Sequence, residues 1–125
     1  HSPCGIMDQM VISKATEGNL LLIDCRDFTT TDVPMKTGTG DKMPVVVIAN
    51  SGVTHSIADG EYGKRRAECY DAVQAMQEVP LYHVLSLRDA TLQDVKDTEE
   101  KMTSTIFNRA KHVVTENQRT KEAKI

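Results

Sequence analysis

The chain has 125 residues, which is enough for one small domain with a hydrophobic core. Its 15 basic and 18 acidic residues give a net charge of −3, which offers no electrostatic reason to expect nucleic acid or an anionic membrane as a partner. No apolar run approaches the roughly 20 residues that span a bilayer, and the three cysteines form no C-x-x-C pair that would support a zinc site.

The first predicted element is a short helix that carries Asp8. Ser2 supplies a capping hydroxyl and Pro3 fixes φ near the helical value, so we expect the helix to start there. Gly5 leaves room for close approach of the backbone to a ligand. Asp8 then lies near the positive end of the helix dipole, which favours its ionised form. Such a carboxylate can cap the helix or accept a proton from a bound hydroxyl, and the residue pattern by itself favours capping.

A β-rich stretch follows a turn signal at Gly18. The apolar run 20–23 predicts a strand that is covered on both faces. Residues 29–33 are β-prone and predict a second strand, antiparallel to the first. Residues 37–42 predict a hairpin loop rather than a phosphate loop, because the Lys-Ser/Thr ending of a Walker motif is missing. Residues 45–49 are mostly β-branched and predict a central strand, with a turn after it.

Helices dominate the second half of the chain. Residues 62–79 carry apolar side chains at every third position and predict a helix that Pro80 ends. Residues 91–94 fit the acidic form of a capping box and predict a second, charged helix. Residues 103–105 supply the next cap, and helical spacing continues to the end of the chain. The apolar side of the first of these helices is expected on Tyr70, Val73, Met76 and Val79.

Strands early and helices late predict an α+β fold in which a β-sheet packs against helices. Cys4, Cys25 and Cys69 are scattered thiols, which suits the reducing cytosol, so we expect a cytoplasmic protein. The chain begins at His1 rather than Met and ends within an expected helix. We therefore expect an interior piece of a longer protein.

Three blocks of the sequence match one known pattern together. The first is Cys-Gly-Ile-Met-Asp-Gln at 4–9 with Leu-Leu-Ile-Asp-Cys-Arg at 21–26. The second lies within 50–69 and includes Glu-Tyr at 61–62, and the third covers most of 109–120. In content and order, these blocks resemble galactokinases, which belong to the GHMP superfamily of small-metabolite kinases. The resemblance implies a GHMP-kinase-like, partial domain: a central segment that runs from the end of the N-terminal domain into helices leading to the C-terminal domain.

The resemblance also implies a site and a reaction. Asp8 matches the catalytic base of the family, Gly5 and Asp8 match residues that touch the sugar, and Tyr62 matches the tyrosine that borders the galactose site. The implied reaction transfers phosphate from ATP to the anomeric hydroxyl of galactose. ATP and Mg²⁺ are expected to be held mainly by residues outside this segment, because the phosphate loop of the family lies upstream of it.

Three alternatives remain open at this point. The chain could come from an N-acetylgalactosamine kinase, although Ile6 argues mildly for galactose. It could come from a galactose-sensing regulatory paralogue, which binds sugar and ATP without useful catalysis. It could also be encoded by an isolated gene fragment whose product has no activity. Tyr62 by itself is more typical of an ordinary helix-start aromatic, and only the match at 61–62 makes a role in the site equally favoured. Gly52 and Thr54 depart from the Asn and Arg that are common in the family.

Overall fold

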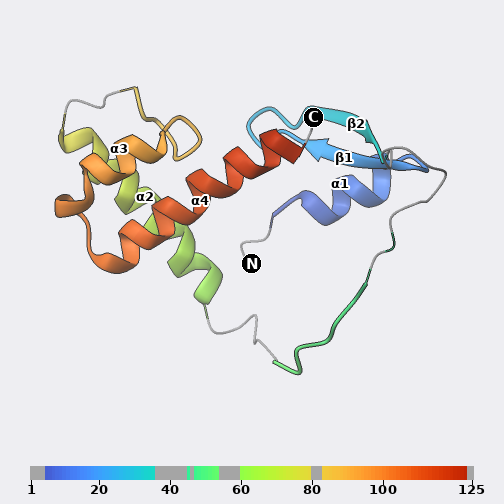
Figure 1. Ribbon diagram of the computed structural model, residues 1–125, viewed down its shortest axis with the longest axis horizontal. Helices are drawn as coiled ribbons and strands as arrows, with labels where there is room; N and C mark the ends of the chain where they lie inside the picture. The colour runs from blue at the N-terminus through green and yellow to red at the C-terminus, as the bar shows by residue number, and fades with distance from the viewer. Residues whose placement is uncertain (1–4, 36–44, 46, 54–59, 80–82, 124–125) are drawn as a thin grey trace. The chain divides into compact units, whose positions relative to one another are not determined.

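The computed structural model describes residues 5–35, 45, 47–53, 60–79 and 83–123 (Figure 1). The chain divides into two compact units, His1–His55 and Ser56–Ile125. Helix α1 and the strands β1 and β2 belong to the first unit, and the helices α2, α3, η2 and α4 belong to the second. The described elements therefore have the predicted order, with strands early and helices late. They form a small α+β segment.

The first unit contains α1 (Met7–Lys14) followed by an antiparallel hairpin of β1 (Asn19–Ile23) and β2 (Thr30–Pro34). Asn19 lies opposite Pro34 at one end of the hairpin, and Ile23 lies opposite Thr30 at the other. Gly18 has a φ of 75°, a left-handed conformation that glycine adopts without strain, and it turns the chain into β1. Both predicted strands and their antiparallel pairing are confirmed. The expected burial of β1 on both faces is wrong, because the Leu20 side chain is exposed.

Helix α1 begins later than the sequence predicts. Its N-cap is Ile6, whose side chain makes no capping hydrogen bond. Ser2 and Pro3, the expected start, lie outside the described residues. Gly5 stands between the expected and the observed starts, and glycine loses more conformational entropy in a helix than any other residue. A start after Gly5 avoids that cost.

The central strand predicted at residues 45–49 is wrong. The described residues of this run are not in a strand, and the side chains of Val45, Val47 and Ile48 are 84%, 84% and 91% exposed. A β-branched run becomes a strand only beside a partner that pairs with its backbone, and the sheet of the described residues contains β1 and β2 alone. The turn that follows is confirmed, because the Asn50 side chain accepts a hydrogen bond from the Gly52 amide at 2.8 Å. The predicted loop at 37–42 lies outside the described residues.

The second unit is a helical cluster around one apolar core. Its elements are α2 (Glu61–Glu78), α3 (Leu92–Asp97), the 3₁₀ helix η2 (Glu99–Lys101) and α4 (Ser104–Ala123), and α4 packs against both α2 and α3. Among the helices of the described residues, none is long and apolar enough to cross a membrane. The core is formed by nine buried side chains: Ala72, Val73, Met76, Val84, Leu87, Ala90, Val95, Ala110 and Val114.

The bounds of α2 match the predicted helix closely, but its buried side differs in part. Val73 and Met76 are buried as expected, whereas Tyr70 is exposed. The Tyr70 hydroxyl accepts hydrogen bonds from the Arg66 guanidinium at 3.1 and 3.4 Å, so its polar end stays at the surface. Small residues, Ala72 and Ala75, occupy the buried positions instead and allow close packing of the helix.

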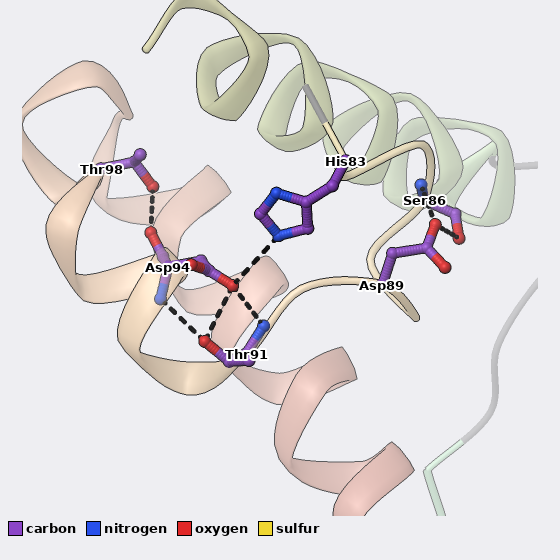
Figure 2. Close-up of polar contacts among 6 residues, drawn as sticks. All are labelled: His83, Ser86, Asp89, Thr91, Asp94 and Thr98. Carbon is purple, nitrogen blue, oxygen red and sulfur yellow. Dashed lines mark hydrogen bonds and ion pairs between the residues drawn. The ribbon is translucent and has the colours of Figure 1, made fainter. Parts of the chain in front are cut away.

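Both predicted caps in the second unit are present. Thr91 and Asp94 form a capping box at the start of α3 (Figure 2). The Thr103 hydroxyl accepts a hydrogen bond from the Ile106 amide at 3.3 Å, just before α4. Each cap satisfies backbone N–H groups that have no partner within the helix.

Candidate functional site

Asp8 lies in the first turn of α1 and its side chain is exposed. The partial positive charge of the helix N-terminus favours a carboxylate at this point. The residue pattern by itself favours capping by Asp8, but in the structure the N-cap of α1 is Ile6. The carboxylate is therefore accessible to a ligand and is not engaged as a cap.

The backbone next to Asp8 is held by its neighbours. With its amide nitrogen turned toward the chain, the Gln9 side chain donates to the carbonyl oxygens of Gly5 and Ile6, at 3.3 Å each. The Met10 amide also donates to the Ile6 carbonyl, at 3.0 Å, and the Met10 side chain is buried. These hydrogen bonds hold the backbone of residues 5–10 at the start of α1, where the Asp8 side chain is exposed.

Tyr62 belongs to the second unit, in the first turn of α2. Gly60 precedes it as the N-cap of α2 with a φ of 67°, and the Lys64 amide donates to the Gly60 carbonyl at 3.0 Å. The Tyr62 side chain is 55% exposed, so a role in packing of the core does not account for it. Gly5 and Asp8 lie in the first unit, and a pocket that they share with Tyr62 stays a prediction.

A partly buried ion pair between α2 and α4 was missed by the sequence reasoning. Arg109 Nε donates to Glu68 Oε2 at 2.8 Å, and the two side chains are 28% and 11% exposed. The residues are 41 positions apart, so no local spacing signals their contact. The only sequence signal is that both positions fall in blocks that resemble galactokinases.

Helix α2 carries other reactive or charged side chains besides Tyr62 and Glu68. Burial raises the pKa of the Cys69 thiol above its ordinary value, and the positive charge of the nearby Arg109 lowers it by less. The thiol therefore remains protonated at neutral pH. Lys64 and Arg65 are exposed, and the Arg66 guanidinium lies 5.6 Å from the centroid of the Tyr70 ring. This arrangement favours a solvated cationic face of α2.

The described residues do not assemble a metal site. Within these parts of the chain, no three His, Cys, Asp or Glu side chains come together in a group that could hold an ion. The chain therefore offers, in its described parts, a carboxylate at a helix entry and a tyrosine at another helix start, without the metal ligands that a phosphoryl-transfer site also uses.

Comparison with known proteins points to one family of enzymes. No family model matches the chain. The chain is 39% identical over 121 residues to a galactokinase of Bos taurus and 38% identical over 121 residues to a galactokinase of Homo sapiens, which covers 97% of the chain in each case. It is 38% identical over 117 residues, 94% of its length, to a galactokinase of Chloroflexus aggregans. The chain spans about 28% of the length of the curated relatives it matches. The predicted resemblance to galactokinases is confirmed.

Proposed function

Because the chain is similar to galactokinases over nearly its whole length, we propose that it is a segment of an enzyme that phosphorylates galactose with ATP. The products are galactose 1-phosphate and ADP. The observation that carries this proposal is the identity of 37–39% to several curated galactokinases over 94–97% of the chain. In the full-length protein we place the segment at the end of the N-terminal domain, running into helices that lead to the C-terminal domain, within a GHMP-kinase-like fold.

Asp8 is the proposed catalytic base. Its carboxylate accepts the proton of the anomeric hydroxyl while the oxygen of that hydroxyl forms a bond to the γ-phosphorus of ATP. Proton transfer of this kind requires the carboxylate oxygen within about 3 Å of the hydroxyl. An exposed carboxylate at the positive end of α1 meets the chemical need, because a hydroxyl can reach it and the helix N-terminus favours negative charge there.

Gly5 and Tyr62 are the proposed sugar contacts. Gly5 has no side chain, which lets the sugar approach the backbone at the entry to α1. Tyr62 offers a flat apolar ring against the sugar and a hydroxyl that can orient it. Its ring is accessible at the start of α2, which a ligand contact requires.

ATP is the proposed phosphate donor, and Mg²⁺ would neutralise charge on its phosphates. The described residues do not fit a magnesium site, since they contain no suitable group of ligands. We therefore assign the ion to the nucleotide phosphates and to residues outside the segment, and no step of the proton transfer depends on it. The free thiols of Cys25 and Cys69 are compatible with a cytoplasmic location, which stays a prediction.

A coupled assay of ADP release by the full-length protein tests this function, with galactose and N-acetylgalactosamine supplied separately and in competition. The proposal predicts sugar-dependent ADP release with a higher kcat/KM for galactose. A higher kcat/KM for N-acetylgalactosamine would contradict the proposed substrate. Binding of galactose and ATP without ADP release would identify a sensor instead of an enzyme.

A further inference from the structure

The start of α2 is exposed to an unusual extent. Every residue from 61 to 67 is exposed, and Glu68 is the first buried residue of the helix. Figure 1 shows these N-terminal turns of α2, in light green, extending beyond the place where α2 and α4 cross. The apolar contacts of α2 with the core begin with the half-buried Cys69, and its first fully buried apolar residue is Ala72, one turn after Glu68. The first two turns therefore project from the core, and they carry Tyr62.

The contact at the base of this projecting segment is the Glu68–Arg109 ion pair. Arg109 lies in the second turn of α4, and its Nε donates to Glu68 Oε2 at 2.8 Å. Glu68 is the one buried carboxylate among the described residues, and the half-buried Cys69 that follows it packs against the apolar core. A charge-assisted hydrogen bond has a preferred direction, which apolar packing lacks. It therefore adds a directional restraint on the rotation of α2 to the packing of Ala72, Val73 and Met76.

We propose that the Glu68–Arg109 ion pair is a positioning contact that holds Tyr62 for sugar binding. Tyr62 precedes Glu68 by six residues, which is about 9 Å along a helix that rises 1.5 Å per residue. A change in the rotation or the order of α2 at Glu68 is carried along the helix to Tyr62. The inference rests on the proposed function, because Tyr62 borders a sugar only if the chain is part of a galactokinase.

The test uses the full-length protein with two variants that break the pair and two that do not. Glu68→Ala breaks it from α2, and Arg109→Gln breaks it from α4 if the first variant folds poorly. Glu68→Gln keeps an oxygen that accepts the Arg109 hydrogen bond. Asp71→Ala removes a carboxylate from an exposed position of the same helix. Hydrogen exchange of the amides of residues 64–68, the melting temperature and the steady-state constants are measured for each protein.

Both breaking variants are expected to exchange these amides faster and to raise the KM for galactose several-fold. The KM for ATP and kcat change little, and both control variants stay close to wild type. Unchanged exchange would overturn the positioning role. Faster exchange or a lower melting temperature with an unchanged KM for galactose would overturn the link to the sugar and leave a purely structural contact.

Failure of the proposed function gives a different result. A wild-type protein that does not phosphorylate galactose contradicts that function, independently of the ion pair. The exchange comparison still decides whether the pair orders the start of α2, since it needs no substrate.

Discussion

Asp94 and Thr91 satisfy each other's backbone groups at the start of α3 (Figure 2). The Thr91 hydroxyl accepts from the Asp94 amide at 3.2 Å, and the Asp94 carboxylate accepts from the Thr91 amide at 2.7 Å. Loss of such a cap typically costs about 1 kcal/mol. We expect Thr91→Ala to lower the free energy of unfolding by that amount in urea denaturation. Thr105→Ala, at an exposed position of α4, is the control and should change stability by less than about 0.5 kcal/mol. Equal effects of the two substitutions would contradict a capping role.

The same cap makes stability depend on pH. Hydrogen bonding from the Thr91 amide holds the pKa of Asp94 below its ordinary value of 3.8, and His83 Nε2 lies 4.0 Å from the carboxylate. A depressed folded-state pKa contributes stability that is present above the unfolded value and is lost as pH falls through the folded value. The difference in melting temperature between wild type and Asp94→Asn should therefore be largest near neutral pH and shrink below about pH 3.8. A constant difference between pH 7 and pH 3 would count against this cause.

The residues that sequence could predict are those whose partners are close in the chain. The capping box at Thr91 needs only a spacing of three, and it is present as predicted. The Glu68–Arg109 pair joins positions 41 residues apart, and its formation depends on how α4 packs on α2. The sequence placed Asp8 near the start of a helix, but it put that start too early, and the role of Asp8 came from the resemblance and not from the pattern.

Helix α2 shows how far a periodic pattern determines packing. The pattern located the helix within one residue at each end, but it also assigned Tyr70 to the buried side. The buried side instead follows the small residues that fit against α4, with Tyr70 kept outside by its contact with Arg66. Spacing alone cannot show which of two neighbouring apolar stripes of a helix is buried, because a polar group such as the Tyr70 hydroxyl can keep one stripe at the surface.

The Met76 side chain is the largest fully buried group of α2 and provides the test of this packing. Met76→Ala leaves a cavity in the core of the second unit, and such truncations cost about 2–5 kcal/mol. Gln74→Ala, at an exposed position of the same helix, is the matched control, with an expected change within about 0.5 kcal/mol. Chemical denaturation measures both. If Met76→Ala lowered the free energy of unfolding less than Gln74→Ala does, this face of α2 would not be the one that packs in the core.

The run at residues 45–49 failed as a strand prediction for a reason outside its own sequence. Its β-branched residues favour extended structure, but strand formation depends on hydrogen bonds to a neighbouring chain segment. The described sheet has two strands, which already pair with each other. Sequence composition could thus predict the preference of this run but not the presence of a partner.

The two units differ in how completely they enclose a core. The second has nine buried core residues, whereas Met10 is the one buried hydrophobic among the described residues of the first. We expect a fragment of residues 56–125 to keep helical circular dichroism and to melt cooperatively. A fragment of residues 1–55 should show neither a cooperative transition nor slow amide exchange. A non-cooperative melt of the longer fragment would contradict an independent core.

The proposed activity places its catalytic step in the first unit, at the entry to α1, so its decisive test concerns Asp8. In the full-length protein, Asp8→Asn preserves the size of the side chain and its ability to contact the sugar, but the amide cannot accept the hydroxyl proton. The account predicts that kcat falls by about 100-fold or more while galactose binding, measured by calorimetry, largely survives. Near-normal turnover of Asp8→Asn would contradict the assignment of Asp8 as the base.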